Sequence, residues 1–156
     1  MLLAVRGEAV VVRAYSETML SRLSAHCNLV YWTDLLPAQI DPLLARLPPG
    51  LTLYRHHCCW SAEEGVWVKD LGRLGCEVGE TVVIDHSEAA FGLNRERGVE
   101  LVWMGKRRDC VLLDCLAVMM RFMEEGAFGE CVESVRRACG RHPQSRAGVR
   151  RRENRH

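Results

Sequence analysis

Short β-branched runs alternate along this chain with segments in which apolar residues recur at helical spacing. Ala9–Arg13 and Thr81–Ile84 are typical of strands. Asn28–Thr33 is almost continuously apolar, so we expect a strand buried on both faces. The same reasoning predicts strands at Leu51–Tyr54 and Val99–Trp103, and a hairpin of Cys58–Trp60 with Val66–Val68 across Ser61–Gly65.

Four segments carry the helical period between these runs. Ser16 and Glu17 are expected to open the first helix, with Ser16 as its N-cap. Asp34 and Pro37 start the second, which Pro48-Pro49-Gly50 ends. The apolar stripes of the four helices are Met19, Leu20 and Leu23; Ile40, Leu43, Leu44 and Leu47; Leu112, Leu113, Leu116, Met119, Met120 and Met123, after Asp109; and Phe128, Val132 and Val135. Strands alternating with helices predict an α/β fold, a Rossmann-like parallel sheet with helices on both faces.

Composition and charge divide the chain at about Gly140. Its 156 residues fit one domain with a net charge of +1, but residues 141–156 hold six arginines and one glutamate, a net of +5. Residues 1–140 therefore carry −4. We predict an α/β domain over 1–140 and a basic, flexible tail over 141–156. A solvated tail is favoured over a nucleic-acid partner because no aromatic residue follows Phe128 to stack on bases. No apolar run is long enough to span a membrane, and no targeting segment is visible.

The eight cysteines do not have the spacing of a metal site, because no pair is separated by two residues. The densest cluster is His56-His57-Cys58-Cys59. In an extended segment, neighbouring side chains point to opposite faces, leaving at most two ligands on each side. We therefore interpret Cys58 as a small buried hydrophobe and expect the other cysteines to pack in the core as well.

Three polar residues follow or end predicted strands, where the reactive groups of open parallel sheets gather. They are Thr33, Lys69 and Asp85. A hydroxyl, an ammonium and a carboxylate together could hold a phosphate and a hydrated divalent ion. The alternatives are a solvated Lys69-Asp70 pair at a helix start and Asp85 as a cap of the following turn.

Three blocks of sequence resemble the carboxy-terminal-domain phosphatases of the haloacid dehalogenase-like superfamily. The blocks are Leu53–Trp60 (LYRHHCCW), Val66–Gly75 (VWVKDLGRLG) and Val82–Ser87 (VVIDHS). Asn94 and Trp103 follow them at places that match the pattern of the family. Upstream, Arg13–Leu20 (RAYSETML) resembles a degraded family motif. The resemblance covers about residues 9–140. It implies that Thr33 contacts phosphate, Lys69 clamps it and Asp85 is a magnesium ligand.

Within that family the chain is most similar to the Tim-fifty-type receptor subunits of the mitochondrial presequence translocase. The similarity lies in Leu112–Phe122, in Gly140–Pro143 and in Val149–Glu153. It implies a translocase subunit on the intermembrane-space side of the mitochondrial inner membrane. Its partners would be the translocase channel subunit and basic presequence peptides.

The sequence departs from this family at the nucleophile. Catalysis by the family needs Asp-x-Asp-x-Thr, one carboxylate to attack phosphorus and another to protonate the leaving oxygen. The aspartates here are at 34, 41, 70, 85, 109 and 114, so none are two apart. Thr33, Lys69 and Asp85 are then expected to be vestigial site residues, and we assign no catalytic residue in this sequence. Magnesium is doubtful, because His86 stands where the family often has an oxygen ligand.

The missing motif also has a structural consequence, because the family carries it on the first, central strand of its sheet. Without that strand, its neighbours present unpaired backbone groups. Either Met1–Val5 replaces it, turning at Arg6-Gly7-Glu8 into Ala9–Arg13, or the motif lies in sequence upstream. The sequence leaves both open. We therefore expect a haloacid dehalogenase-like pseudoenzyme that acts in protein import. The alternative is a fragment of a magnesium-dependent Ser/Thr protein phosphatase.

Overall fold

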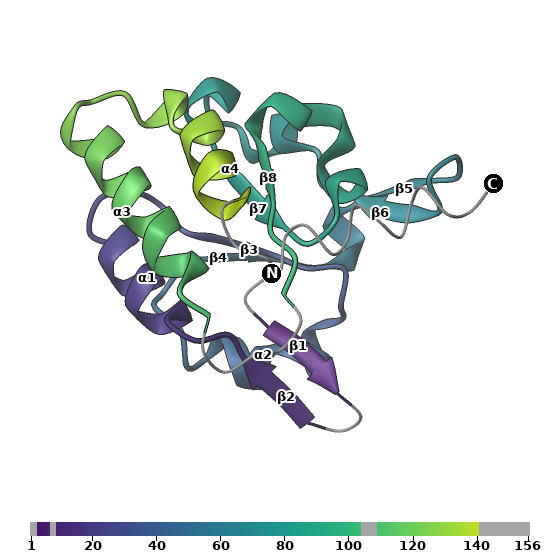
Figure 1. Cartoon of the computed structure of the whole chain (residues 1–156). Helices are drawn as coiled ribbons and strands as arrows, with labels where there is room; N and C mark the ends of the chain where they lie inside the picture. Colours follow the sequence, from purple (N-terminus) through teal and green to yellow (C-terminus); the bar gives the residue numbers. More distant parts are fainter. Residues whose placement is uncertain (1–2, 7–8, 104–108, 141–156) are drawn as a thin grey trace.

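The computed structural model describes residues 3–6, 9–103 and 109–140, and its strands pair two by two (Figure 1). β3 and β4 are parallel, as are β7 and β8, whereas β1–β2 and β5–β6 are antiparallel hairpins. The strand bounds are Leu3–Arg6 (β1), Ala9–Val12 (β2), Val30–Trp32 (β3), Leu51–Leu53 (β4), Cys59–Ser61 (β5), Val66–Val68 (β6), Val83–Asp85 (β7) and Gly98–Glu100 (β8). The predicted α/β class and the predicted β5–β6 hairpin are confirmed.

The parallel strands form two separate pairs rather than the single sheet that the sequence predicted. Leu51 N donates to Leu29 O and Thr33 N to Leu53 O, both at 2.9 Å, so these alternate residues of the β3 segment face β4. The intervening residues, Val30 and Trp32, direct their backbone groups to the opposite edge. Within the described ranges, no strand pairs with that edge of β3 or with the free edge of β7.

The N-terminal hairpin does not fill this gap. β1 pairs with β2 in the register Leu3↔Val12 to Arg6↔Ala9, and with no other strand in the described part of the chain. Gly7 and Glu8 of the predicted turn lie outside the described residues. The expectation that Met1–Val5 replaces the central strand is wrong for the residues that the structure describes, because β1 is bonded only to its own hairpin partner.

Of the four α-helices in the described residues, three share one core with β8. In Figure 1, α1 and α3 lie side by side and α4 packs next to α3, in agreement with their residue contacts. Leu112 and Met119 are buried in this core, so the predicted methionine stripe is a packing surface. The α-helices are Ser16–Leu23 (α1), Pro37–Leu44 (α2), Val111–Glu124 (α3) and Val132–Gly140 (α4), and 3₁₀ segments cover Arg55–His57, Leu71–Leu74, Val78–Glu80, Glu88–Arg97 and Phe128–Glu130.

Local details differ from the sequence predictions at three places. Ser16 is not the N-cap of α1: Tyr15 is, with φ 64°, and the Ser16 hydroxyl donates to Arg13 O at 2.8 Å. β3 is not buried on both faces, because Val30 is 39% exposed. Of the stripe predicted for α2 only Ile40 is buried, whereas Leu43, Leu44 and Leu47 are half-buried.

The cysteines divide between core and surface. Cys58, Cys115, Cys131 and Cys139 are buried as expected and Cys27 is half-buried, whereas the prediction is wrong for Cys59, Cys76 and Cys110, which are exposed. No helix in the described ranges has the length and apolar character needed to cross a bilayer. The predicted boundary at Gly140 stays a prediction, because residues 141–156 lie outside the described residues.

Candidate functional site

The site is built around a buried ion pair between Lys69 and Asp85. Lys69 directly follows β6, Asp85 ends β7, and the Lys69 ammonium donates to Asp85 Oδ2. The two side chains are only 10% and 8% exposed. Lys69 is also fixed through its backbone, because its N–H donates to Ala90 O at 2.7 Å. Two of the three predicted site residues therefore meet, and they neutralise each other.

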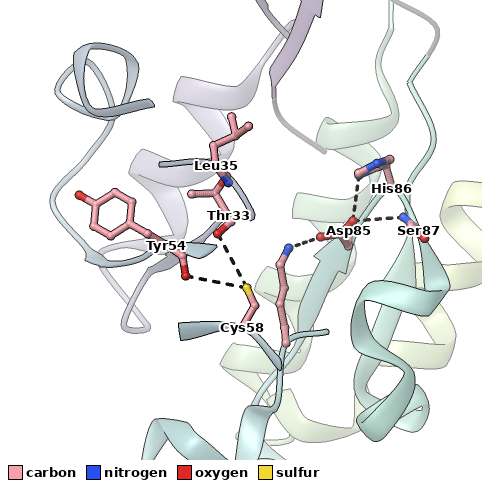
Figure 2. A network of polar contacts seen from close by, with 8 residues as sticks. Thr33, Leu35, Tyr54, Cys58, Asp85, His86 and Ser87 are labelled. Carbon is pink, nitrogen blue, oxygen red and sulfur yellow. Dashed lines mark hydrogen bonds and ion pairs between the residues drawn. The ribbon is translucent and has the colours of Figure 1, made fainter. Parts of the chain in front are cut away.

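The second oxygen of Asp85 is occupied as well. Oδ1 lies 2.9 Å from His86 Nδ1 and accepts from the Ser87 backbone N–H at 3.1 Å (Figure 2). Burial raises the pKa of Asp85, but the hydrogen bond from His86 and the charge of Lys69 outweigh burial and hold this pKa well below its usual range. Asp85 is thus a buried, ionised carboxylate whose two oxygens are both bonded. The Ser87 contact binds Asp85 to the turn that follows it, but Asp85 is not the predicted N-cap, because the N-cap of Glu88–Arg97 is Ser87.

Thr33 lies near this pair without touching it. Its hydroxyl accepts from Leu35 N at 3.1 Å, and its carbonyl accepts from the Cys58 thiol at 3.9 Å (Figure 2). Burial raises the pKa of Cys58, and the nearby charge of Lys69 opposes that rise. Cys58 therefore contacts the Thr33 carbonyl and lies within reach of the charge of Lys69. The Thr33 hydroxyl is used within its own turn.

Asp70 and Asn94 hold the loop that follows Lys69. Asp70 is the N-cap of the segment Leu71–Leu74 and accepts from Gly72 N at 3.1 Å. Asn94 accepts from Leu71 N at 3.1 Å. The alternative of a solvated Lys69-Asp70 pair at a helix start is therefore right in placing Asp70 at a helix start, where it is the cap. It is wrong for Lys69, which is buried and paired with Asp85.

In the His56-His57-Cys58-Cys59 cluster the two histidines are not extended, so the predicted separation onto opposite faces is wrong for them, whereas Cys58 is buried and Cys59 exposed. Arg55–His57 forms a 3₁₀ turn that brings the two imidazole rings to 4.0 Å between centroids. His57 Nδ1 accepts from Tyr54 N at 3.0 Å. This bond ties His57 to its own turn, and within the described ranges no three His, Cys, Asp or Glu side chains form a metal-binding group.

A magnesium ion does not fit the residues around Asp85. Mg²⁺ takes octahedral oxygen ligands. Here the one carboxylate at the site bonds to an ammonium, an imidazole and a backbone amide. A cation beside Asp85 would have to displace Lys69, so no step is assigned to a metal.

One polar pair of the core escaped the sequence analysis. Arg13 Nε donates to Asp109 Oδ2 at 2.8 Å across 96 residues, and both side chains are fully buried. Asp109 Oδ1 also accepts from Val111 N at 3.1 Å, at the start of α3. The position of Arg13 at the end of an apolar run was the available signal, but its partner is too distant in sequence to identify from spacing.

Residues 3–131 match the family described as "NIF: NLI interacting factor-like phosphatase". The chain is 30% identical over 112 residues to "CTD small phosphatase-like protein 1" of Caenorhabditis elegans, covering 69% of this chain and 22% of that protein. It is 29% identical over 115 residues to "Probable C-terminal domain small phosphatase" of Dictyostelium discoideum, covering 70% and 37%. It is 30% identical over 86 residues to "Mitochondrial import inner membrane translocase subunit TIM50" of Kluyveromyces lactis, covering 54% and 17%. The chain thus spans well under half the length of each of these relatives.

Proposed function

Because the chain belongs to the NLI interacting factor-like phosphatase family, we propose that this region has kept the phosphatase-like fold as a binding domain without catalysis. We place it in the mitochondrial inner-membrane presequence translocase, on the intermembrane-space side, as a receptor subunit. One observation supports the absence of catalysis. Both oxygens of the Asp85 carboxylate, at the end of β7, are bonded to Lys69, His86 and Ser87.

Phosphoryl transfer through an aspartate requires chemistry that this arrangement does not supply. One carboxylate must attack phosphorus while a second group protonates the leaving oxygen. No two aspartates in this sequence are two residues apart. Both oxygens of Asp85 already have hydrogen-bonding partners, and Lys69, which would clamp a phosphate, is paired with Asp85. The pair therefore acts as a structural link between β6 and β7.

We propose that the function of this domain is to bind a polypeptide. The import role is supported by the similarity to the translocase subunit of Kluyveromyces lactis and by the net charge of −4 over residues 1–140. An acidic surface attracts basic amphipathic presequences over a distance set by ionic strength. The translocase channel subunit is the second partner that this role requires.

The test is a titration of the 156-residue chain with a synthetic amphipathic helical peptide whose polar face carries only arginine. The control is a peptide of identical composition in scrambled order, which keeps the charge and removes the apolar face. We expect binding of the amphipathic peptide that weakens as salt rises, and weaker binding of the control. No binding at low ionic strength, or equal binding of both peptides, overturns the receptor proposal.

The alternative function is a magnesium-dependent Ser/Thr protein phosphatase of which this chain is a part, favoured by the phosphatase names of two relatives. We expect the 156-residue chain to be inert towards an aryl phosphate with and without Mg²⁺. Asp85→Asn is the matched control for contaminating activity. Metal-dependent turnover that disappears in this variant would establish the phosphatase instead.

A further inference from the structure

Two cysteine sulfurs meet in the core between α3 and α4. Cys115 Sγ and Cys139 Sγ are 3.2 Å apart, and the residues are 0% and 3% exposed. A disulfide has an S–S length of about 2.05 Å. The sulfurs are therefore about 1 Å from bonding distance, a displacement that side-chain rotation and small helix movements can supply. α3 and α4 already pack against each other, so the backbones need not come together from afar (Figure 1).

A buried positive charge acts on both sulfurs. The guanidinium of Arg13 uses Nε and Nη2 on Asp109, and Nη1 is buried with no hydrogen-bond partner among the described residues. The hydrogen bond from Cys115 and the charge of Arg13 together outweigh burial and lower the pKa of Cys139. The same hydrogen bond between the two thiols, together with burial, raises the pKa of Cys115. The charge of Arg13 thus favours a thiolate at this pair of sulfurs, and the direction of the two pKa shifts favours Cys139 as that thiolate.

Access to the pair is also unequal. Cys139 lies in the last turn of α4 and lines a surface depression together with Gly98, Glu100, Arg136 and Gly140. Cys115 does not line it and has no exposed surface. A small oxidant therefore reaches Cys139 first, with Cys115 directly behind it.

We propose that Cys115 and Cys139 form a peroxide-sensitive dithiol that closes to a disulfide between α3 and α4. The Cys139 thiolate attacks one oxygen of hydrogen peroxide, the O–O bond breaks, and Cys139 sulfenic acid and hydroxide form. Cys115 then loses its proton and attacks the Cys139 sulfur. The S–O bond breaks and the proton leaves with the hydroxyl group as water. In total two thiols and one peroxide give one disulfide and two waters, and a thiol reductant reverses the change.

The experiment oxidises the chain with hydrogen peroxide in a background in which the exposed Cys59, Cys76 and Cys110 are serine. We expect an intact mass lower by about 2 Da, as two hydrogens are lost, and one cross-linked peptide joining the two helices. Cys115→Ala and Cys139→Ala must each abolish the cross-link. Cys131→Ala is the matched control, since Cys131 is buried in the same core and no sulfur contact to it is observed among the described residues.

A second readout separates the proposed order of steps from mere proximity. With Cys115→Ala, the sulfenic acid on Cys139 cannot be resolved, so dimedone should label Cys139 in the folded protein, as verified by circular dichroism. With Cys139→Ala, Cys115 should stay unlabelled. A cross-link to Cys131, preferential labelling of Cys115, or a folded protein that gains oxygen without the cross-link would overturn the proposal.

Discussion

The Lys69–Asp85 pair offers the sharpest test of the reasoning, because a structural link and a ligand site respond in opposite ways to losing one charge. Lys69→Met keeps the length of the side chain and removes the ammonium. It leaves the Asp85 carboxylate buried, at 8% exposure, with His86 and Ser87 as its remaining partners. Removing one member of a buried ion pair costs about 3–5 kcal/mol. Since a tenth of the Lys69 side chain is exposed, we expect the lower end, about 3 kcal/mol.

The assay is a double-mutant cycle followed by thermal and urea unfolding. A loss of about 3 kcal/mol lowers the Tm of a chain of this size by roughly 6–12 °C. Asp85→Asn should cost a similar amount, because it leaves the Lys69 ammonium without its counter-charge. The double variant should cost only about 1 kcal/mol, since neither charge is then buried alone. The loss in the double variant should therefore be several kcal/mol smaller than the sum of the two single losses, and this difference is the coupling energy between the two positions.

The pH dependence follows from the same pair. The pKa of Asp85 is lower in the folded protein than in the unfolded chain, so the folded state binds fewer protons at this group. Its contribution is fully present above the unfolded value of about 3.9 and is lost as pH falls below it. The difference in stability between the parent and Asp85→Asn should therefore shrink in acid. Unchanged or increased stability in both single variants at neutral pH would refute the role of the pair as a structural link. It would point instead to a ligand site, because charged groups kept for binding lower the stability of the folded protein.

Three further outcomes test the fold. Arg13→Leu should lower the free energy of unfolding by about 3–5 kcal/mol in urea titrations, because it leaves a fully buried carboxylate unpaired. Gly98→Ala should lower the Tm, because the new Cβ would lie 2.0 Å from Phe91 Cδ2, and Phe91→Ala in the same chain should recover part of that loss. The amides of Trp32 and Ile84 should exchange with deuterium faster than their strand neighbours, since alternate residues of β3 and β7 turn their backbone groups away from the paired strand; equal protection along both strands would contradict the open edges.

Local chemistry explains which parts of the fold the sequence predicted. The hairpin Cys59–Ser61 with Val66–Val68 follows from β-branched and aromatic residues flanking a turn, and its Trp60↔Trp67 pair lies in register. The α3 stripe follows from helical spacing alone. Ser16 failed as a cap because Tyr15 adopts a left-handed conformation that starts the helix one residue earlier, which residue preference does not indicate.

The sequence predicted which residues lie at the candidate site, but it did not predict the hydrogen bonds and ion pairs that they form. Strand ends located Thr33, Lys69 and Asp85, but no local pattern shows that Lys69 bonds to Asp85 while the Thr33 hydroxyl turns back to Leu35. Long-range partners are decided by packing. For that reason no sequence signal identifies the partners in the Arg13–Asp109 pair, separated by 96 residues, or in the Cys115–Cys139 contact, separated by 24.

The bonded carboxylate and the open strand edges have one common origin. The resemblance in the sequence implies a central strand that bears aspartates, and if that strand paired with the open edges of β3 and β7 its carboxylates would compete for Lys69. In the described residues neither edge is paired, and Lys69 has Asp85 as its only ion-pair partner. A lysine buried to this extent must be paired to stay charged, so in this arrangement Asp85 takes the role of structural counter-ion. Any segment that came to occupy the gap with acidic side chains would therefore weaken the Lys69–Asp85 bond, and the coupling measured between these two residues would fall.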